Sequence, residues 1–340
     1  MASRIERYWY SGKRPLRWLA PVAALFGWIV ARRRAAYASG RRRSRHPGMP
    51  VLVVGNITVG GTGKSPFTAW LVRHLQKRGW RPVILSRGYG GSAEHYPFLV
   101  TGDSDPGQCG DEPVMLAQQT GAYVVVDPSR PRGADYARAH DMGDVLVCDD
   151  GLQHYALQRD LEFCIFDGAR GIGNGALLPV GPLREPVSRC LDIDFCITTG
   201  PATGPGFDVS PLASRALYPV TLQPIRLRHL LSGESVPMEW LEGRIINAIA
   251  GIGNPARFFD SLYELGAKVI PHAYPDHHRF HSGELALPHG PLVMTAKDAV
   301  KCQSITPDDT WVLDVVAEPG PEFVEALNKR LEQLGEPANG

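Results

Sequence analysis

The sequence predicts an α/β fold: a doubly wound parallel sheet, a second, smaller α/β domain after it, and a helix at the amino terminus that lies in a membrane interface. Three observations predict this. Short apolar runs alternate with helix-like or loop segments through the first 200 residues, which is typical of a doubly wound sheet. Residues 200–211 are rich in Gly, Pro, Ser and Thr, as in a linker. A basic and apolar segment precedes both parts.

The chain has 340 residues, of which 44 % are hydrophobic and 21 % charged, as in ordinary globular proteins. This length suggests two domains or one large one. We expect a basic amphipathic membrane-association segment at 1–48, a nucleotide-binding domain at 49–203 and a smaller α/β domain at 204–340. The six cysteines form no CxxC pair, and several lie in apolar runs, which indicates buried, reduced thiols.

The amino-terminal segment differs in charge from the rest. Residues 1–50 contain twelve Lys and Arg and one acid, so the other 290 residues carry about −10 of the net charge of +1. Residues 18–31 are apolar, with Arg14 before them and Arg32 to Arg34 after them. A helix of this length spans about 21 Å, less than a hydrocarbon core of about 30 Å. We expect it to lie on an anionic, cytoplasmic membrane surface. A core helix with a basic rim and a nucleic-acid arm are the alternatives.

A glycine-rich turn follows the first apolar run. Strand, turn and helix succeed one another in residues 50–79, and the turn ends in Gly63, Lys64 and Ser65. This order is the context of a phosphate-binding loop, in which the lysine contacts phosphates and the hydroxyl binds Mg²⁺. Thr58 stands where the usual motif has its first glycine. The sequence therefore predicts a variant P-loop, with a glycine-rich hairpin as the alternative.

Further strands and helices follow from the apolar patterns. After the loop we expect strands at 81–86, 122–126, 144–148, 161–167 and 193–198. In the second half we expect strands at 244–250, 268–271, 291–295 and 310–316, with helices at 256–265 and 322–334.

Acidic residues stand where two of these elements begin or end. Asp149 and Asp150 end the strand at 144–148, where carboxylates hold Mg²⁺ in phosphoryl-transfer enzymes. Asp111 opens the helix-like stretch at 114–120, either as a cap or as an acceptor of a proton from an attacking hydroxyl. Tyr89 lies between glycines after another strand, in a ligand contact or a simple turn.

The second half contains one polar segment, residues 272–281, with four histidines and Asp276. Its spacing fits neither H-E-x-x-H nor a zinc finger. We therefore favour an imidazole oriented by a carboxylate, with Asp276 steering His277 in acid-base chemistry; a solvated polar turn is the alternative. Residues 295–298, TAKD, have the wrong order for the [NT]-K-x-D motif of guanine-selective GTPases.

Together these residues make the chain similar to the tetraacyldisaccharide 4′-kinases of lipid A biosynthesis, which are P-loop enzymes. The resemblance is carried by VGNITVGGTGKSP, SRGYGG, GDEP, DDGLQH, GNGALLPVGPLREP, AIAGIGNP, DHH and MTAKDAVK, in this order. It implies phosphorylation of the 4′-hydroxyl of a tetraacylated glucosamine disaccharide 1-phosphate with ATP and Mg²⁺. It also implies a peripheral location on the cytoplasmic face of the inner membrane of a Gram-negative bacterium.

The resemblance also implies roles for individual residues. Asp111 would be the catalytic base, with His277 and Asp276 in a relay with it, and Lys64 would hold phosphates. The nucleotide would contact Gly60, Gly61, Thr62, Gly63, Lys64, Ser65 and Gln153. The metal would contact Ser65, Asp149, Asp150 and Glu185. The substrate would contact Tyr89, Arg130 and Arg184, with Arg132 as an alternative to Arg130. Ala296 stands where this family is expected to have Glu.

The expected partners are the lipid disaccharide and an anionic membrane surface, and no nucleic acid; the sequence does not determine the oligomeric state. One alternative function is a nucleotide-gated adaptor or regulatory NTPase at the membrane. Such a protein would bind partners in a nucleotide-dependent way and phosphorylate no small molecule.

Overall fold

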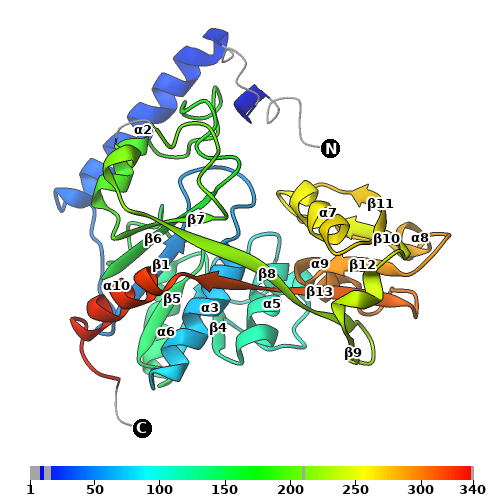
Figure 1. Cartoon of the computed structure of the whole chain (residues 1–340). Helices are drawn as coiled ribbons and strands as arrows, with labels where there is room; N and C mark the ends of the chain where they lie inside the picture. Colours follow the sequence, from blue (N-terminus) through cyan, green and yellow to red (C-terminus); the bar gives the residue numbers. More distant parts are fainter. Residues whose placement is uncertain (1–7, 11–16, 209–210, 338–340) are drawn as a thin grey trace.

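The structure is a computed structural model of the chain and describes residues 8–10, 17–208 and 211–337. Within these residues thirteen strands form one sheet, in the order β11-β10-β12-β13-β8-β7-β6-β1-β5-β2-β4-β3, with β9 on β8. The long strands β8 (Leu217–His229) and β13 (Thr310–Pro319) pair antiparallel. They run from the larger part of the molecule into the smaller one (Figure 1). The predicted α/β class is confirmed.

The larger part contains the first seven strands. They are β1 (Val51–Gly55), β2 (Pro82–Ser86), β3 (Phe98–Val100), β4 (Tyr123–Val126), β5 (Val145–Cys148), β6 (Leu161–Asp167) and β7 (Phe195–Thr199). All neighbours pair in parallel except β3 and β4. Sequence analysis predicted six of them and missed β3, which has only three residues. Because β1 lies between β5 and β6, the strand order reverses there, and ligands of such sheets bind at the carboxyl ends near that point.

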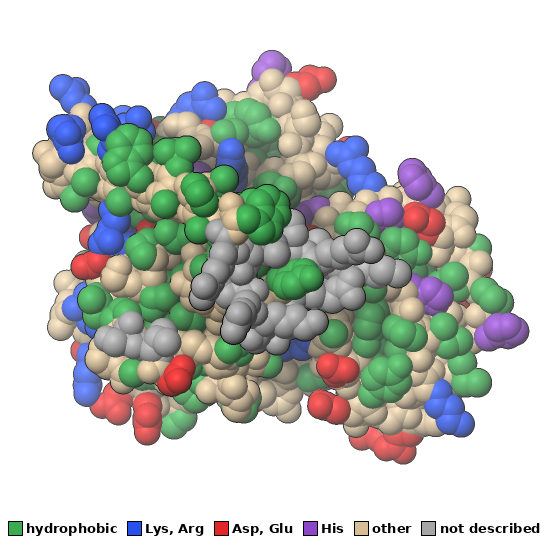
Figure 2. Space-filling model, turned by 90° about the horizontal axis from the view of Figure 1, so that it is seen from above, with side chains coloured by type: hydrophobic (Ala, Val, Ile, Leu, Met, Phe, Trp, Pro, Cys, Tyr) green, Lys and Arg blue, Asp and Glu red, His purple; other side chains and the backbone are tan. Residues whose placement is uncertain are grey.

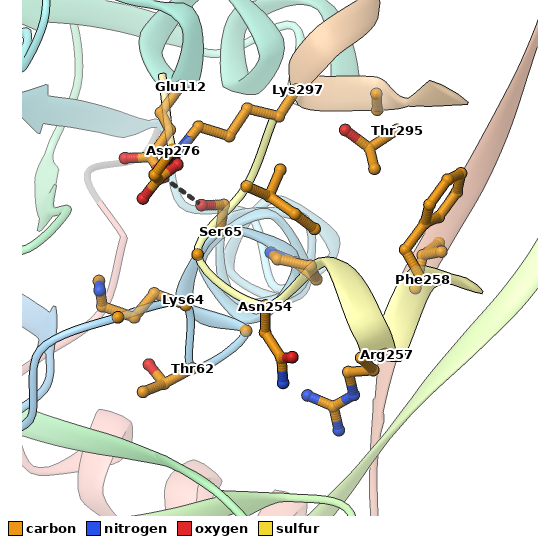
Figure 3. Close-up of a pocket in the computed structure, with 18 of the residues that line it drawn as sticks. Thr62, Lys64, Ser65, Glu112, Asn254, Arg257, Phe258, Asp276, Thr295 and Lys297 are labelled. Atoms are coloured by element: carbon orange, nitrogen blue, oxygen red, sulfur yellow. Dashed lines mark hydrogen bonds and ion pairs between the residues drawn. The ribbon is translucent and has the colours of Figure 1, made fainter. Parts of the chain in front are cut away.

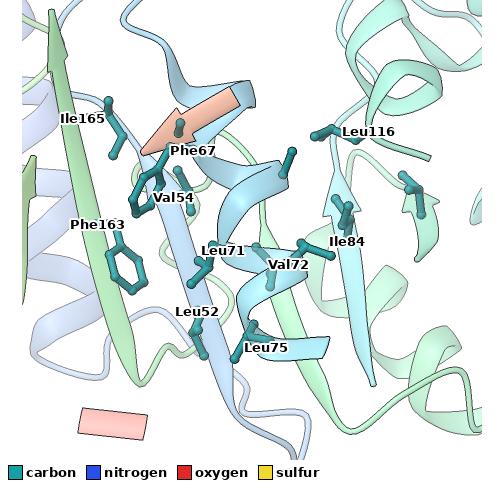
Figure 4. Packing of buried hydrophobic residues seen from close by; sticks show 14 of the residues in the cluster. Leu52, Val54, Phe67, Leu71, Val72, Leu75, Ile84, Leu116, Phe163 and Ile165 are labelled. Atoms are coloured by element: carbon teal, nitrogen blue, oxygen red, sulfur yellow. The ribbon is translucent and has the colours of Figure 1, made fainter. Parts of the chain in front are cut away.

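Helices cover the faces of this part of the sheet. They are α3 (Lys64–Lys77), α4 (Pro106–Cys109), α5 (Asp111–Thr120) and α6 (Arg130–Ala139). The side chains of Phe67, Leu71 and Leu75 project from α3 toward Leu52 on β1 and Phe163 on β6 (Figure 4). Each is fully buried, and burying one such side chain contributes roughly 1.5–3 kcal/mol. This packing fixes α3, and with it the glycine loop that precedes it.

The smaller part has a parallel sheet of its own. It consists of β10 (Ile245–Ala250), β11 (Lys268–Ala273), β12 (Leu292–Thr295) and the first residues of β13. Its helices are α7 (Pro255–Glu264), α8 (Ser282–Leu285) and α9 (Ala296–Cys302), and β9 (Ser235–Val236) pairs with β8. Short 3-10 turns, η2 (Val187–Asp192), η3 (Leu212–Ser214) and η4 (Met238–Leu241), connect elements. The predicted strands and helices are present; β8 was not predicted, although it has thirteen residues.

The last helix, α10 (Pro321–Glu332), returns to the larger part. Its Phe323 is 1 % exposed, and its ring centroid lies 5.8 Å from that of Phe67 and 5.3 Å from that of Phe195. The chain therefore crosses between the two parts twice, on β8 and on β13. The division between residues 203 and 204 remains a prediction.

The amino-terminal helix α2 (Ala20–Ala38) follows the turn η1 (Arg17–Leu19). It has 19 residues, more than the 14 predicted, because it continues through the basic flank, and none of its residues is buried. It reaches the body of the molecule through an ion pair from Arg34 to Asp192 and through the rings of Tyr37 and Tyr155. No helix in the described part of the chain is long and apolar enough to cross a bilayer. Arg14 lies outside the described residues.

Candidate active site

A cavity of about 620 Å³ lies between the larger and the smaller part. One wall is the glycine loop with the start of α3, and another is the start of α5. The smaller part contributes the turn at 252–254, the start of α7, the turn at 276–277 and the start of α9. Side chains from both parts point into this space (Figure 3). The cavity is therefore formed only when the two parts of the chain are together.

The glycine loop adopts a conformation that a side chain would disturb. Gly63 precedes α3 with φ +81°, and a Cβ added there would lie 2.7 Å from Cγ2 of Thr199. Thr199 donates its hydroxyl to the carbonyl of Thr62. The loop thus holds the amino terminus of a 14-residue helix at the cavity, where free N–H groups and the helix dipole favour an anion.

Thr58, at the variant position of the loop, is 1 % exposed and forms an isolated bridge with Leu183. It lies three residues after the end of β1 and does not line the cavity. Gly60 and Gly61 line the cavity instead, together with Gly63 and Lys64.

The predicted carboxylates at the end of β5 lie beside the loop. Asp150 is 3.6 Å from Nζ of Lys64 and 3.2 Å from the guanidinium of Arg184. Burial would raise the pKa of Asp150, but these two cations outweigh it and hold the pKa well below its usual range. Asp149 is buried and accepts a hydrogen bond from Thr68. Burial, and next the negative charges of Glu112 and Asp150, raise the pKa of Asp149.

Glu185, predicted as a metal ligand, lies behind this group. It is 1 % exposed and accepts hydrogen bonds from Gln153 and Tyr155, with Arg189 3.6 Å away. Gln153 also donates to the carbonyl of Asn56, just before the glycine loop. Neither Glu185 nor Gln153 lines the cavity. In this structure Gln153 connects Glu185 to the backbone just before the glycine loop.

The predicted substrate residues lie in three different environments. Arg184 lines the cavity. Tyr89 is 67 % exposed, and its ring centroid lies 4.9 Å from that of His277. Arg130 is 1 % exposed and donates to the carbonyl of Asp149, away from the cavity wall. The alternative, Arg132, pairs with Asp127. Tyr89 and Arg184 are therefore accessible from the cavity, whereas Arg130 supports the acidic turn.

The fit of Mg²⁺ follows from these donors. Within the described residues no three His, Cys, Asp or Glu side chains form a metal cluster. Mg²⁺ in nucleotide sites needs only one or two carboxylates, because phosphates and water complete its shell. Asp150 and the hydroxyl of Ser65 both line the cavity, and Asp149 lies next to them. These oxygens fit Mg²⁺ together with nucleotide phosphates.

Asp111 and His277 meet across the boundary between the two parts. Nδ1 of His277 lies 3.0 Å from Oδ1 of Asp111, and Asp111 is 4 % exposed. Burial would raise the pKa of Asp111, but the bond to His277 and the charges of Lys297 and Lys301 lower it below its usual range. Asp276 accepts a hydrogen bond from the backbone N–H of His277. The structure thus brings together the three residues predicted for acid-base chemistry.

Two groups of site residues were missed by sequence reasoning. Glu112 and Lys297 are 3.1 Å apart, and Glu112 accepts a hydrogen bond from Ser65 at 3.3 Å (Figure 3). Asn254 donates to Asp167 at the end of β6. Arg257 donates to Thr199, which in turn donates to the carbonyl of Thr62 in the glycine loop. The motifs GDEP, AIAGIGNP and MTAKDAVK contain three of these residues, and Arg257 follows the second motif by two positions. They were recognised as motifs, but no role was assigned within them.

Comparison with known proteins shows which family the chain resembles. The family model of tetraacyldisaccharide-1-P 4′-kinase matches residues 15–332. The tetraacyldisaccharide 4′-kinase of Pseudomonas aeruginosa (strain LESB58) is 44 % identical over 335 residues, covering 98 % of each chain. That of Azotobacter vinelandii (strain DJ / ATCC BAA-1303) is 42 % identical over 336 residues, again covering 98 % of each.

A solved structure has the same fold. The crystal structure of LpxK from Aquifex aeolicus in complex with ATP superposes with a TM-score of 0.74 and 26 % sequence identity. It covers 93 % of this chain and 98 % of that one. The match of the family model over nearly the whole length, and the identity to the relatives, are decisive: the chain belongs to the tetraacyldisaccharide-1-P 4′-kinase family and is a P-loop kinase.

Proposed function

We propose that this protein transfers the γ-phosphoryl group of ATP to the 4′-hydroxyl of a tetraacylated disaccharide 1-phosphate, releasing ADP. The observation that carries the proposal is that the phosphate-binding loop and His277 line the same cavity, and that Nδ1 of His277 lies 3.0 Å from the Asp111 carboxylate. The relatives from Pseudomonas and Azotobacter bear the name of this activity. A nucleotide-gated adaptor has no evident use for the Asp111–His277 pair, so we favour the kinase.

We assign the nucleotide phosphates to the glycine loop. The backbone N–H groups of residues 60–63 and the ammonium of Lys64 would contact the phosphates. Ser65, Asp149 and Asp150 would hold Mg²⁺, which neutralises phosphate charge when bound. Because Lys64 lies 3.6 Å from Asp150, the lysine and the metal site adjoin. Gln153 donates hydrogen bonds to Glu185 and to the carbonyl of Asn56. Together Glu185 and Gln153 would keep the backbone before the glycine loop in place.

We assign proton transfer to Asp111. Its carboxylate would accept the proton of the 4′-hydroxyl as the oxygen bonds to the γ-phosphorus and the bond to ADP breaks. His277, whose backbone N–H donates to Asp276, would assist through its hydrogen bond to the Asp111 carboxylate. Tyr89 and Arg184 would contact the sugar or its phosphate at the open side of the cavity.

We assign membrane association to the amino-terminal helix. Trp18 on η1 is 75 % exposed and Trp28 on α2 is 56 % exposed, and the guanidinium of Arg32 lies 5.1 Å from the ring centroid of Trp28. Figure 2 shows basic and hydrophobic side chains next to each other on the left side of the molecule. Such a surface fits an anionic leaflet, and the lipid substrate resides in a leaflet. We therefore infer a peripheral position on the cytoplasmic face of the inner membrane.

The test uses the full chain in detergent micelles that contain the lipid disaccharide 1-phosphate, with γ-labelled ATP and Mg²⁺. Label should move to the lipid. Lys64→Ala and Asp111→Asn should each slow transfer by about 10²-fold or more, while Lys77→Ala, at the far end of α3, should transfer normally. Transfer at the normal rate by both variants, or label found only in free phosphate, would contradict the proposal.

A further inference from the structure

The TAKD segment, which the sequence excluded as a guanine-binding motif, places Lys297 against the acid-base pair. We propose that Lys297 is a positioning residue for the transfer reaction, which keeps the ring proton of His277 on Nδ1 so that it is donated to Asp111. The inference rests on the proposed function and specifies how His277 takes part in it.

The contacts of Lys297 are with the acid-base residues themselves. Its Nζ lies 3.1 Å from Oε1 of Glu112, 3.1 Å from Oδ1 of Asp276 and 3.3 Å from Nε2 of His277. The side chain is 12 % exposed and lines the cavity. In Figure 3 it extends from α9 toward Glu112 and Asp276. A lysine from the smaller part thus contacts the start of α5 in the larger part.

These contacts determine where the imidazole carries its proton. An ammonium group has three N–H donors and no acceptor. Nε2 of His277 faces that ammonium and must accept a hydrogen bond, so in the neutral ring the proton is on Nδ1. Nδ1 in turn faces Asp111 at 3.0 Å. His277 therefore donates to the carboxylate and orients it, and a neutral ring in this tautomer takes no proton from Asp111 through Nδ1.

The position of Lys297 is fixed by its own helix. Asp298 accepts hydrogen bonds from the backbone N–H of Gly251 at 3.0 Å and from the hydroxyl of Thr295 at 2.7 Å. Lys301 donates to Asp298 at 2.7 Å and lies 3.8 Å from Asp111. Asp298 is fully buried. The start of α9 is therefore held against the end of β10. This fixes the position of the Lys297 backbone, from which the side chain extends.

Charged and titratable groups face His277 from each of the elements packed against it. Asp111 faces it from α5, Lys297 from α9, Asp276 from its own turn and the Tyr89 ring from the turn after β2. Burial lowers the pKa of His277, the bond to Asp111 raises it, and the ammonium of Lys297 lowers it; the balance is above the usual value. Removing Lys297 should therefore raise this pKa further.

Two substitutions separate the hydrogen bond from the charge. Lys297→Met removes both, whereas Lys297→Gln keeps an N–H donor near Nε2 without the charge. The full chain, labelled with ¹⁵N in its histidines, gives the tautomer and the titration midpoint of His277 by NMR, with His277→Gln to assign the signal. Lys329→Met, on the exposed side of α10, is the matched control.

We expect the Nδ1–H tautomer in the wild type and in Lys297→Gln, and a mixture in Lys297→Met. Both variants should have a higher midpoint than the wild type and the control. In the micelle assay Lys297→Met should lower kcat by about 10- to 100-fold, with the KM for ATP within about threefold. The acid limb of its kcat profile should move to higher pH.

An Nε2–H tautomer in the wild type, or a Lys297→Met spectrum and pH profile identical to those of the wild type, would overturn the inference. A rise in KM for ATP at constant kcat would also overturn it, because it would make Lys297 a nucleotide-binding residue. If the wild type transferred no phosphate to lipid, the proposed function would fail. The NMR measurement would still decide the role of Lys297.

Discussion

Nδ1 of His277 lies 3.0 Å from Oδ1 of Asp111, although 166 positions separate the two residues in the chain. Asp111 begins a helix of the larger part, and His277 lies on the turn that follows β11 of the smaller part. The contact therefore joins the two parts and completes the candidate acid-base pair at the same time. Any motion that separates the parts would dismantle the pair, which would limit ATP hydrolysis in an open protein.

This contact gives stability a pH dependence. The pKa of His277 is raised in the folded chain, so its contribution is complete below the unfolded pKa of about 6.5 and is lost as pH rises through the folded pKa. The pKa of Asp111 is lowered, so its contribution is lost only in acid. The wild type should therefore lose more stability between pH 6 and pH 9 than His277→Gln does. Urea unfolding at the two pH values measures this.

The control for that comparison is His95→Gln, at an exposed position. It should show the same pH dependence as the wild type. An equal loss of stability in His277→Gln and the wild type would show that the contact with Asp111 does not form in solution.

Gly63→Ala should abolish nucleotide binding. The substitution combines the strain of φ +81° with a Cβ 2.7 Å from Thr199, so the loop must move away from its anion-binding shape. Gly121→Ala is the matched variant, because Gly121 has φ +65° but nothing within 4 Å of the added Cβ. It should cost about 1 kcal/mol of stability and leave ATP affinity unchanged. Calorimetric titration with ATP distinguishes the two, and normal affinity in Gly63→Ala would contradict the placement of the loop.

Arg257→Met should weaken ATP binding by roughly 5- to 30-fold, the equivalent of one or two hydrogen bonds. Arg257 donates to the hydroxyl and the carbonyl of Thr199, at 2.9 and 2.7 Å, and Thr199 holds the carbonyl of Thr62 in the glycine loop. The measurement is the dissociation constant of ATP. Arg330→Met, at an exposed ion pair with Asp194, should bind ATP as the wild type does; equal affinities of the two variants would contradict this role.

Replacing Trp18 and Trp28 together by Ser should weaken binding to anionic vesicles by at least about 10-fold, because two exposed aromatic side chains are lost from the interface. Binding of the wild type should also fall with salt, since the arginines of α2 act through screened charges. Tyr123→Ser, which removes an exposed aromatic side chain from β4, is the control. Phosphate transfer in detergent should remain, and unchanged vesicle binding would contradict the membrane role of η1 and α2.

Much of the fold was predictable because its signals are local. Apolar runs predicted the buried strands β1, β5 and β6, and the glycine turn before Lys64 predicted the helix that follows it. Strand β8 was missed because most of its side chains are exposed or half-buried, so that it lacks an apolar run. The cysteines were correctly predicted to be buried and unpaired.

The sequence by itself determined the fold class, the phosphate-binding loop and the two carboxylates after β5, because each depends on residues that are neighbours in the chain. Only the tertiary structure decided which side chains reach the cavity. It placed the ammonium of Lys297 next to Nε2 of His277. It also placed Arg130 where it donates to the carbonyl of Asp149, away from the cavity. The physical reason is that the site lies between two parts of the chain, so its contacts depend on how β8 and β13 carry the smaller part across the sheet.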